Sequence, residues 1–276
     1  MLSDALSPDA KIEVPASWDE YEYAQELLDT EGNKFPRLCY DSTRQIAIVV
    51  AAPTPLHGDM VGELVGSLAK SCNEILLRGG ISADIRPSCI IHVGVSQSYR
   101  SLQEAISWCV CALHCRLGIA MCLDEGPRGA KSDVQYYANE EEAAAAILQA
   151  TNELRLQLRQ NPFGPLVRNG VTWFGTLEKV VIETFRCENA NCPPGTLLYP
   201  TRSFVVIRDG QSGAEDIPPN LGEVVLGDCV PSHVLSGDEI LATPIDFFQK
   251  SWIDAKIRSA ILETAVERIE NECFIL

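Results

Sequence analysis

The chain has 276 residues, with 38 acidic and 22 basic side chains, so its formal net charge is −16 at pH 7. Apolar residues make up 46% of it, which is enough to bury a sizeable core and excludes a wholly disordered chain. The apolar runs are too short to span a bilayer, and no export signal is visible, so we expect a cytoplasmic protein without a membrane segment. The acidic balance argues against nucleic acid as a partner, because nucleic-acid binders usually present a basic face.

The sequence contains eleven cysteines. An odd number without an export signal predicts free thiols rather than a disulfide framework. Cys109, Cys111 and Cys115 lie among apolar neighbours, and Cys109 and Cys111 cannot share one helical face, so we interpret this stretch as core rather than a metal site. Cys187 and Cys192 are predicted at a hairpin tip, where a zinc knuckle would need a second cysteine pair. We therefore predict no bound metal and no cofactor.

In chain order, the first 34 residues are acidic, with nine Asp and Glu against two Lys, and contain a short helical pattern over 18–28. Two β-rich runs, 37–41 and 45–50, flank a turn and predict a hairpin. Apolar residues then recur at helical spacing over 60–72, which predicts a helix.

A fully buried strand is predicted over 89–95, where an apolar run is bounded by turn residues. A helix is expected over 102–111, and a second buried strand, parallel to the first, over 117–123. The order of hairpin, helix, strand, helix and strand predicts an α/β core.

The second half of the chain begins with a helix predicted over 139–160, which is rich in Ala, Leu and Glu. Strands are expected over 180–185 and 203–207, on either side of a turn rich in Pro and Gly, and a polar loop over 209–220. From residue 244 onward, apolar residues predict a long amphipathic helix. The chain has no P-loop, dinucleotide, Gly-x-Ser-x-Gly or His-Glu-x-x-His motif, which argues against standard hydrolases and dehydrogenases.

The first half of the chain contains, in order, PRLCYD, QIAIVV, APTPLH before a helix, SADIRP, IIHVGVSQS and a strand that ends in LDE. In order and spacing it resembles the restriction endonuclease family of the PD-(D/E)XK superfamily, whose fungal members share the tract around GVSQSYRSL. The resemblance implies an α/β fold, with a restriction-endonuclease-like mixed sheet core flanked by helices, an added β-hairpin region and a long C-terminal helix. We expect an acidic N-terminal arm at 1–34 and a single domain at 35–276, with its core at 35–126 and elaborations at 127–276.

Active members of that superfamily bind a divalent metal through an Asp on one strand and, on the next, an acidic residue followed two positions later by Lys. By this resemblance Asp84 takes the place of the first Asp, whereas His92 takes the acidic position and Gly94 that of the Lys. The resemblance therefore implies a degenerate metal site. At the centre of such a cleft, His92 could act as a general acid or base, with Asp84 as a second catalytic candidate. The alternatives are a core histidine and a turn or cap aspartate.

Three more residues are candidate ligand contacts. Glu63, on the predicted helix, could supply an oxygen, as a helix carboxylate of the family does, and a solvated helix face is the alternative. His57 matches the Pro-x-His signal of the family before that helix, so a structural turn role is equally open. Gln97 lies in the polar tract directly after the central strand.

Three functions remain open. We predict a catalytically degenerate nuclease-fold protein whose cleft binds a small, largely apolar molecule, with a metal-independent cyclase or isomerase of secondary metabolism as the candidate activity. The alternatives are a protein-interaction module without catalysis and a divalent-metal-dependent nuclease, which the replaced metal ligands and the acidity oppose. Whether the protein is an enzyme stays open. The apolar face of the terminal helix could serve a homodimer if it does not pack on its own core.

Overall fold

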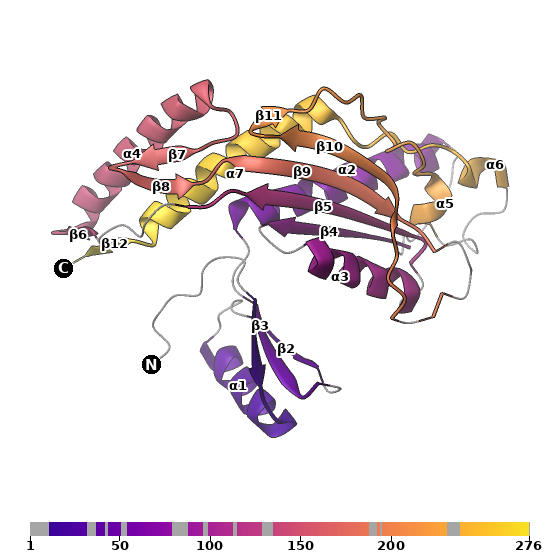
Figure 1. Cartoon of the computed structure of the whole chain (residues 1–276), viewed down its shortest axis with the longest axis horizontal. Coiled ribbons are helices and arrows are strands. Elements are labelled where there is room, and N and C mark those ends of the chain that lie inside the picture. Colours follow the sequence, from indigo (N-terminus) through magenta and orange to yellow (C-terminus); the bar gives the residue numbers. More distant parts are fainter. Residues whose placement is uncertain are drawn as a thin grey trace. The chain divides into compact units, whose positions relative to one another are not determined.

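The computed structural model describes residues 11–31, 37–41, 44–50, 54–78, 88–95, 99–112, 115–128, 135–187, 192–193, 195–230 and 238–275. The chain divides into two compact units, residues 1–54 and residues 55–276 (Figure 1). The boundary predicted at residue 34 lies inside the first unit, so the predicted hairpin groups with the N-terminal helix.

The first unit is a small antiparallel sheet with one helix. Its three strands pair in the order β1 (Lys11–Pro15), β3 (Ile46–Val50) and β2 (Arg37–Asp41). The pairing of β2 with β3 confirms the predicted hairpin, whereas β1 was not predicted. The helix α1 (Trp18–Glu31) begins with a capping box, in which Ser17 Oγ accepts from the backbone N of Glu20 at 3.3 Å and Glu20 accepts from the backbone N of Ser17 at 2.8 Å.

A five-stranded mixed sheet forms the centre of the second unit. Its strands lie in the order β11 (Gln211–Ser212), β10 (Pro200–Arg208), β9 (Leu177–Phe185), β5 (Leu117–Glu125) and β4 (Cys89–Val95). β4 and β5 run parallel, as predicted, and every other neighbouring pair is antiparallel. The helix α3 (Tyr99–Ala112) connects the parallel pair, so this part of the sheet is a β–α–β unit.

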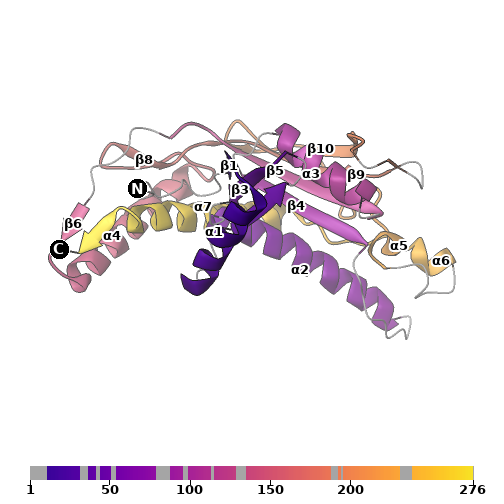
Figure 2. The same ribbon diagram turned by 90° about the horizontal axis from the view of Figure 1, so that it is seen from below.

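Helices cover both faces of this sheet, with α2 and α3 on opposite sides of β4 (Figure 2). On one face α2 (Pro55–Arg78) and α7 (Lys250–Glu270) join alternate strand residues such as Ile119 in the main core. On the other face Ile106 of α3 packs in a smaller core with Ala120. Because successive strand residues point to opposite faces, each strand contributes one set of side chains to each layer.

The remaining elements extend the unit beyond the sheet. They are the parallel strands β6 (Gln135–Tyr137) and β12 (Cys273–Ile275), the helix α4 (Glu140–Gln160), the hairpin of β7 (Leu166–Arg168) and β8 (Val171–Phe174), and the short helices α5 (Leu226–Cys229) and α6 (Asp238–Leu241). The side chain of Asn139 caps α4 by accepting a hydrogen bond from the backbone N of Glu142 at 2.9 Å. This cap explains why the helix begins where it was predicted to begin.

The C-terminal helix α7 packs on its own chain. Ile257, Ile261 and Ala265 are fully buried in the main core, as the amphipathic pattern predicts, whereas Trp252 of the same helix is 38% exposed. The apolar face is therefore not available as the surface on which a homodimer was predicted, and the dimer itself stays a prediction. The fold class is confirmed as mixed α/β, with a helix-covered five-stranded sheet, a β-hairpin and a long C-terminal helix. None of the helices in the described part of the chain has the length and apolarity that crossing a bilayer requires.

Candidate functional site

His92 lies in the middle of β4, on the side of the sheet that faces α3. Ile90, two residues earlier, packs against the α3 core, whereas Ile91 and Val93 belong to the main core on the opposite face. The register places His92 opposite Ala120 of β5, which is also in the α3 core. His92 therefore points to the face opposite Ile91 and Val93. The prediction of a fully buried strand is wrong, because β4 lies at the end of the described sheet and its first four residues, His92 included, are half-buried.

The surroundings of His92 favour the neutral imidazole. Burial lowers the pKa of His92 below its ordinary value, and the nearby His57 lowers it further. His57 lies in the first turn of α2, so two of the predicted site residues come within electrostatic range of each other. A neutral imidazole offers one donor and one acceptor nitrogen. The catalytic role of His92 and the ligand contact of His57 stay predictions.

Glu63 lies on α2 and forms an ion pair with Lys256 of α7, with 3.2 Å between Oε2 and Nζ. Its side chain is 12% exposed, so it is mostly buried rather than solvated. The helix–helix contact occupies this carboxylate, and its predicted role as a ligand contact remains untested. Asp84 and Gln97 lie outside the described residues, so their predicted roles also stay predictions.

Glu183, near the carboxyl end of β9, is a buried acidic side chain on the α3 side of the sheet. The residue is only 7% exposed. Its Oε2 accepts a hydrogen bond from the hydroxyl of Tyr99 at 2.7 Å, and its Oε1 accepts one from Ser203 Oγ at 2.8 Å. Within the described ranges, no Lys, Arg or His side chain lies within ion-pair distance of this carboxylate. A buried carboxylate held by hydroxyl donors alone is costly in a purely structural role, so we treat Tyr99, Glu183 and Ser203, the Glu183 cluster, as the candidate site.

The strand register links the Glu183 cluster to His92. Paired residues on four neighbouring strands run His92, Ala120, Glu183 and Ser203. Directly paired residues point to the same face, so all four project toward the α3 side. His92 and Glu183 are two strand spacings apart, roughly 10 Å, and the small side chain of Ala120 lies between them.

Two neighbours of Glu183 have perturbed pKa values. Burial raises the pKa of Tyr99 above its ordinary value, and the hydrogen bond to Glu183 adds to this, so the phenol stays a neutral donor. Burial also raises the pKa of Cys122, on β5; the charges of Asp124 and Glu183 raise it further, and Lys179 opposes them. The Cys122 thiol is therefore influenced by two negative side chains, Asp124 and Glu183, and by one positive side chain, Lys179.

The two carboxylates near Cys122 do not converge on one point. Asp124 pairs with Lys179 across β5 and β9, and Lys179 is four residues from Glu183 along β9, which is roughly 13 Å. In the described part of the chain, no three His, Cys, Asp or Glu side chains are arranged to hold a metal ion. What the structure brings together at Glu183 is a carboxylate with two hydroxyl donors, a set suited to hydrogen bonding and proton transfer.

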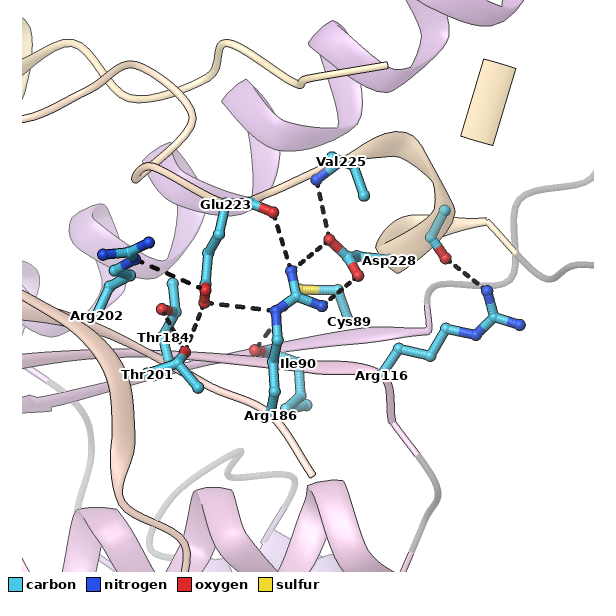
Figure 3. A network of polar contacts seen from close by, with 11 residues as sticks. Cys89, Ile90, Arg116, Thr184, Arg186, Thr201, Arg202, Glu223, Val225 and Asp228 are labelled. Atoms are coloured by element: carbon cyan, nitrogen blue, oxygen red, sulfur yellow. Dashed lines mark hydrogen bonds and ion pairs between the residues drawn. The ribbon is translucent and has the colours of Figure 1, made fainter. Parts of the chain in front are cut away.

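A second polar network lies just beyond the carboxyl end of β9 (Figure 3). Arg186 donates to both carboxylate oxygens of Asp228, at 2.5 and 2.7 Å, and to the backbone oxygen of Glu223 at 3.1 Å. Glu223 in turn accepts a hydrogen bond from Thr201 at 2.6 Å and lies 4.0 Å from Nε of Arg202. The hydrogen bonds with Asp228 raise the pKa of Arg186.

The charges of this second network are matched, with two arginines against two carboxylates. Asp228, which is 5% exposed, also accepts a hydrogen bond from the backbone N of Val225 at 2.9 Å. A paired network of this kind fixes the position of its segments, so we interpret it as a structural clamp between β9, β10 and α5. Glu183 differs because its two hydrogen-bond donors are uncharged.

The first unit has a hollow of its own, about 430 Å³ in volume, lined by Pro15, Ala16, Ser17, Trp18, Glu20, Tyr40 and Gln45. The rings of Trp18, Tyr21 and Tyr40 lie with their centroids 5.3–5.4 Å apart. Trp18 is 51% exposed. The hollow is therefore bordered by an aromatic cluster that solvent can reach.

None of the three residues of the Glu183 cluster was predicted as a site residue. A signal for Glu183 was present, because it is the one acidic residue within VVIETF, a run of six residues that are all buried. Its two partners could not be linked to it in advance, since the contacts with Tyr99 and Ser203 span 84 and 20 residues.

Comparison of the chain with family models, with curated proteins and with solved structures finds no match. The resemblance to the restriction endonuclease family therefore stays a prediction.

Proposed function

We propose that the second unit binds a small, largely apolar organic molecule beside the Glu183 cluster, and that Glu183 moves a proton on this molecule without a metal ion. The observation that carries the proposal is the 2.7 Å hydrogen bond between Tyr99 and Glu183, whose carboxylate has no cationic partner in the described part of the chain. Isomerases and cyclases of secondary metabolism carry out reactions of this class.

In this proposal Glu183 is the general base. It takes a proton from one carbon of the substrate and returns it at another, so the product is an isomer and no co-reactant is used. Tyr99 keeps its proton because its pKa is raised, and it supplies a hydrogen bond to the site throughout. The Tyr99 side of the cluster is open to an arriving molecule, because Tyr99 is 42% exposed.

The proposal includes a restriction-endonuclease-like framework whose metal site has degenerated. Two features support it: the parallel strands β4 and β5 joined by α3, and the position of His92 in the same row as Glu183. His92, held neutral, would contact a second polar group of the ligand. Asp84 keeps its proposed catalytic role and Gln97 its proposed ligand contact.

The test is proton exchange in heavy water. Uncharged cyclic ketones and enones serve as probes, and exchange of the protons next to the carbonyl is followed by NMR. We expect catalysed exchange that Glu183→Gln reduces by a factor of at least about 10². The matched control is Glu178→Gln, which removes the same charge from an exposed position on β9 and should leave exchange unchanged. Absence of exchange with every probe, or equal exchange in Glu183→Gln, would count against the proposal.

The nuclease alternative is separated by a second assay on the same protein. Cutting of plasmid DNA that needs Mg²⁺ or Mn²⁺ and disappears in Asp84→Ala would overturn the proposal in favour of a metal-dependent nuclease.

A protein-interaction role is the second candidate, and the aromatic cluster of the first unit favours it. Exposed tryptophan and tyrosine are enriched at protein–protein contacts. If this role is the main one, Trp18→Ala should abolish co-purification of a partner, whereas Glu183→Gln should leave it intact.

A further inference from the structure

The thiols of Cys111 and Cys192 lie 2.8 Å apart, although the residues are separated by 81 positions in the sequence. Cys111 lies in the last turn of α3 and is 1% exposed, and Cys192 lies, partly buried, in the connection between β9 and β10. In a disulfide the sulfurs are about 2.05 Å apart, so these two would need to approach by only about 0.8 Å.

α3 holds this connection through a row of polar side chains. Nε2 of Gln103 donates to the backbone oxygen of Leu198 at 2.7 Å, and Oγ of Ser107 accepts from the backbone N of Leu198 at 2.9 Å. Cys111 follows Ser107 by four residues and so lies on the same face of the helix. Its sulfur is also 3.9 Å from the backbone oxygen of Thr196. The anchored segment keeps Cys192 against the end of α3.

The two thiols differ in acidity. Hydrogen bonds with Cys111 and then Cys187 lower the pKa of Cys192. Burial raises the pKa of Cys111 to about 12, and its neighbours Cys192 and Cys187 contribute. The thiolate is the reactive form of cysteine, so Cys192 is the more reactive of the two, with a protonated thiol directly beside it.

These three thiols are not arranged as ligands of one metal ion. Two sulfurs bound to a tetrahedral zinc, at about 2.3 Å each, would be roughly 3.8 Å apart, which is wider than the observed pair. Among the described residues, no three metal-ligating side chains form a metal site. The geometry favours bond formation between Cys111 and Cys192.

We propose that Cys192 is a site of reversible oxidation by hydroperoxides and that Cys111 completes an internal disulfide with it. The Cys192 thiolate attacks the terminal peroxide oxygen and the O–O bond breaks. The released hydroxide, or the alkoxide when the peroxide is organic, takes up a proton to give water or an alcohol. The resulting sulfenic acid is attacked by the sulfur of Cys111; hydroxide leaves from Cys192 and takes the Cys111 proton as a second molecule of water. A dithiol reductant restores both thiols. This site shares no residue with the Glu183 cluster and stands without the proposed function.

A second thiol pair provides an internal comparison. Cys72 and Cys229 are 2% and 4% exposed in the main core. The hydrogen bond with Cys229, together with burial, raises the pKa of Cys72. Thiols in such surroundings react slowly, so this pair should stay reduced under conditions that oxidise Cys192.

The test uses the reduced full chain, treated with a small excess of hydrogen peroxide, blocked with N-ethylmaleimide and digested with trypsin without reduction. We expect peptide 101–116, which has three cysteines, to be joined to peptide 187–202, which has two. Because the peptides hold several thiols, single variants assign the bond. The cross-link should disappear in Cys111→Ser and Cys192→Ser and persist in the matched controls Cys109→Ser and Cys115→Ser.

Thermal melting gives a readout that does not depend on peptide assignment. Oxidation should raise the melting temperature of the wild type by about 5–10 °C, because the bond closes a long loop, and should leave that of Cys192→Ser unchanged. Circular dichroism of each reduced variant shows whether it folds. The proposal is overturned if Cys192 remains open to N-ethylmaleimide after peroxide treatment, if the cross-link survives Cys192→Ser, or if Cys187 and Cys192 form the only bond.

Discussion

Arg268 of α7 and Glu125 at the end of β5 form a bidentate ion pair inside the second unit, with 2.8 Å from Nη1 to Oε1 and 2.9 Å from Nη2 to Oε2. Their side chains are 9% and 3% exposed. Arg268 also donates to the backbone oxygen of Trp173, and Glu125 accepts from the backbone N of Gly175, both at 2.9 Å. The pair therefore joins the terminal helix, the central sheet and the β7–β8 hairpin region.

Removal of one partner of this pair should be strongly destabilising. We expect Glu125→Gln to lower the free energy of unfolding by about 3–5 kcal/mol, because it leaves a buried guanidinium without its counter-charge. Urea denaturation followed by circular dichroism measures the change. The exposed pair of Arg100 and Glu104 is the control, and Glu104→Gln should cost at most about 0.5 kcal/mol. A similarly small loss of unfolding free energy in both variants would contradict a strong contribution of the buried pair of Arg268 and Glu125 to stability.

Gly118 of β5 packs directly against α3. A Cβ at this position would lie 2.7 Å from Cγ2 of Ile106 and 3.1 Å from Cγ2 of Val110. Gly118→Ala should therefore reduce the free energy of unfolding by about 1–3 kcal/mol through overpacking. Gly62 of α2 has no atom within 4 Å of such a Cβ, so Gly62→Ala should stabilise the protein by about 0.5–1 kcal/mol. Urea denaturation should therefore give a lower free energy of unfolding for Gly118→Ala and a higher one for Gly62→Ala than for the wild type.

His92 should make stability depend on pH. Its pKa in the folded state is lowered by burial and by His57, so the fold favours the neutral imidazole. The stabilising contribution is fully present above the ordinary value of 6.5 and is lost as the pH falls below it toward the folded-state pKa. We expect the free energy of unfolding to fall more steeply below that pH in the wild type than in His92→Gln. Equal slopes in urea titrations at several pH values would contradict a half-buried His92 that the fold holds neutral.

Tyr99 reports on the charge of Glu183. Because the hydrogen bond and the charge of Glu183 both raise the pKa of Tyr99, Glu183→Gln should lower it, although burial continues to raise it. Phenolate absorbance during alkaline titration measures this, and Tyr99→Phe isolates the signal from those of the other tyrosines. Tyr99→Phe should also cost about 1–3 kcal/mol of stability, since it leaves a buried acceptor with one donor fewer. An unchanged Tyr99 titration in Glu183→Gln would show that the two groups are not coupled.

Local patterns were sufficient to predict most of the elements around the candidate site. The apolar runs that became β4 and β5 are bounded by turn residues, and their parallel arrangement follows from the helix between them. β1 was not predicted. Charged residues flank Ile12 on both sides and the segment ends in Pro15, so its sequence lacks the pattern of a strand. Its place in the sheet depends on pairing with β3, more than thirty residues later in the chain.

The site was harder to predict than the fold. The alternation of β4 was enough to place His92 on one face, because that property depends only on neighbouring residues. The Glu183 cluster depends on β9 lying beside β5, which no local pattern encodes. The prediction of Cys111 as a core residue is confirmed, but its contact with Cys192 arises from the anchoring of a distant connection on α3.

The polar row along α3 runs through Tyr99, Gln103, Ser107 and Cys111, one residue in every four, and spans about 18 Å. Each member contacts β9 or the connection that follows it. Because α3 makes four such contacts along its length, it cannot slide or rotate without breaking all four. The helix therefore has one position on this surface. A ligand at Tyr99 or a disulfide at Cys111 that stabilises one end of α3 would therefore also fix the position of its other end.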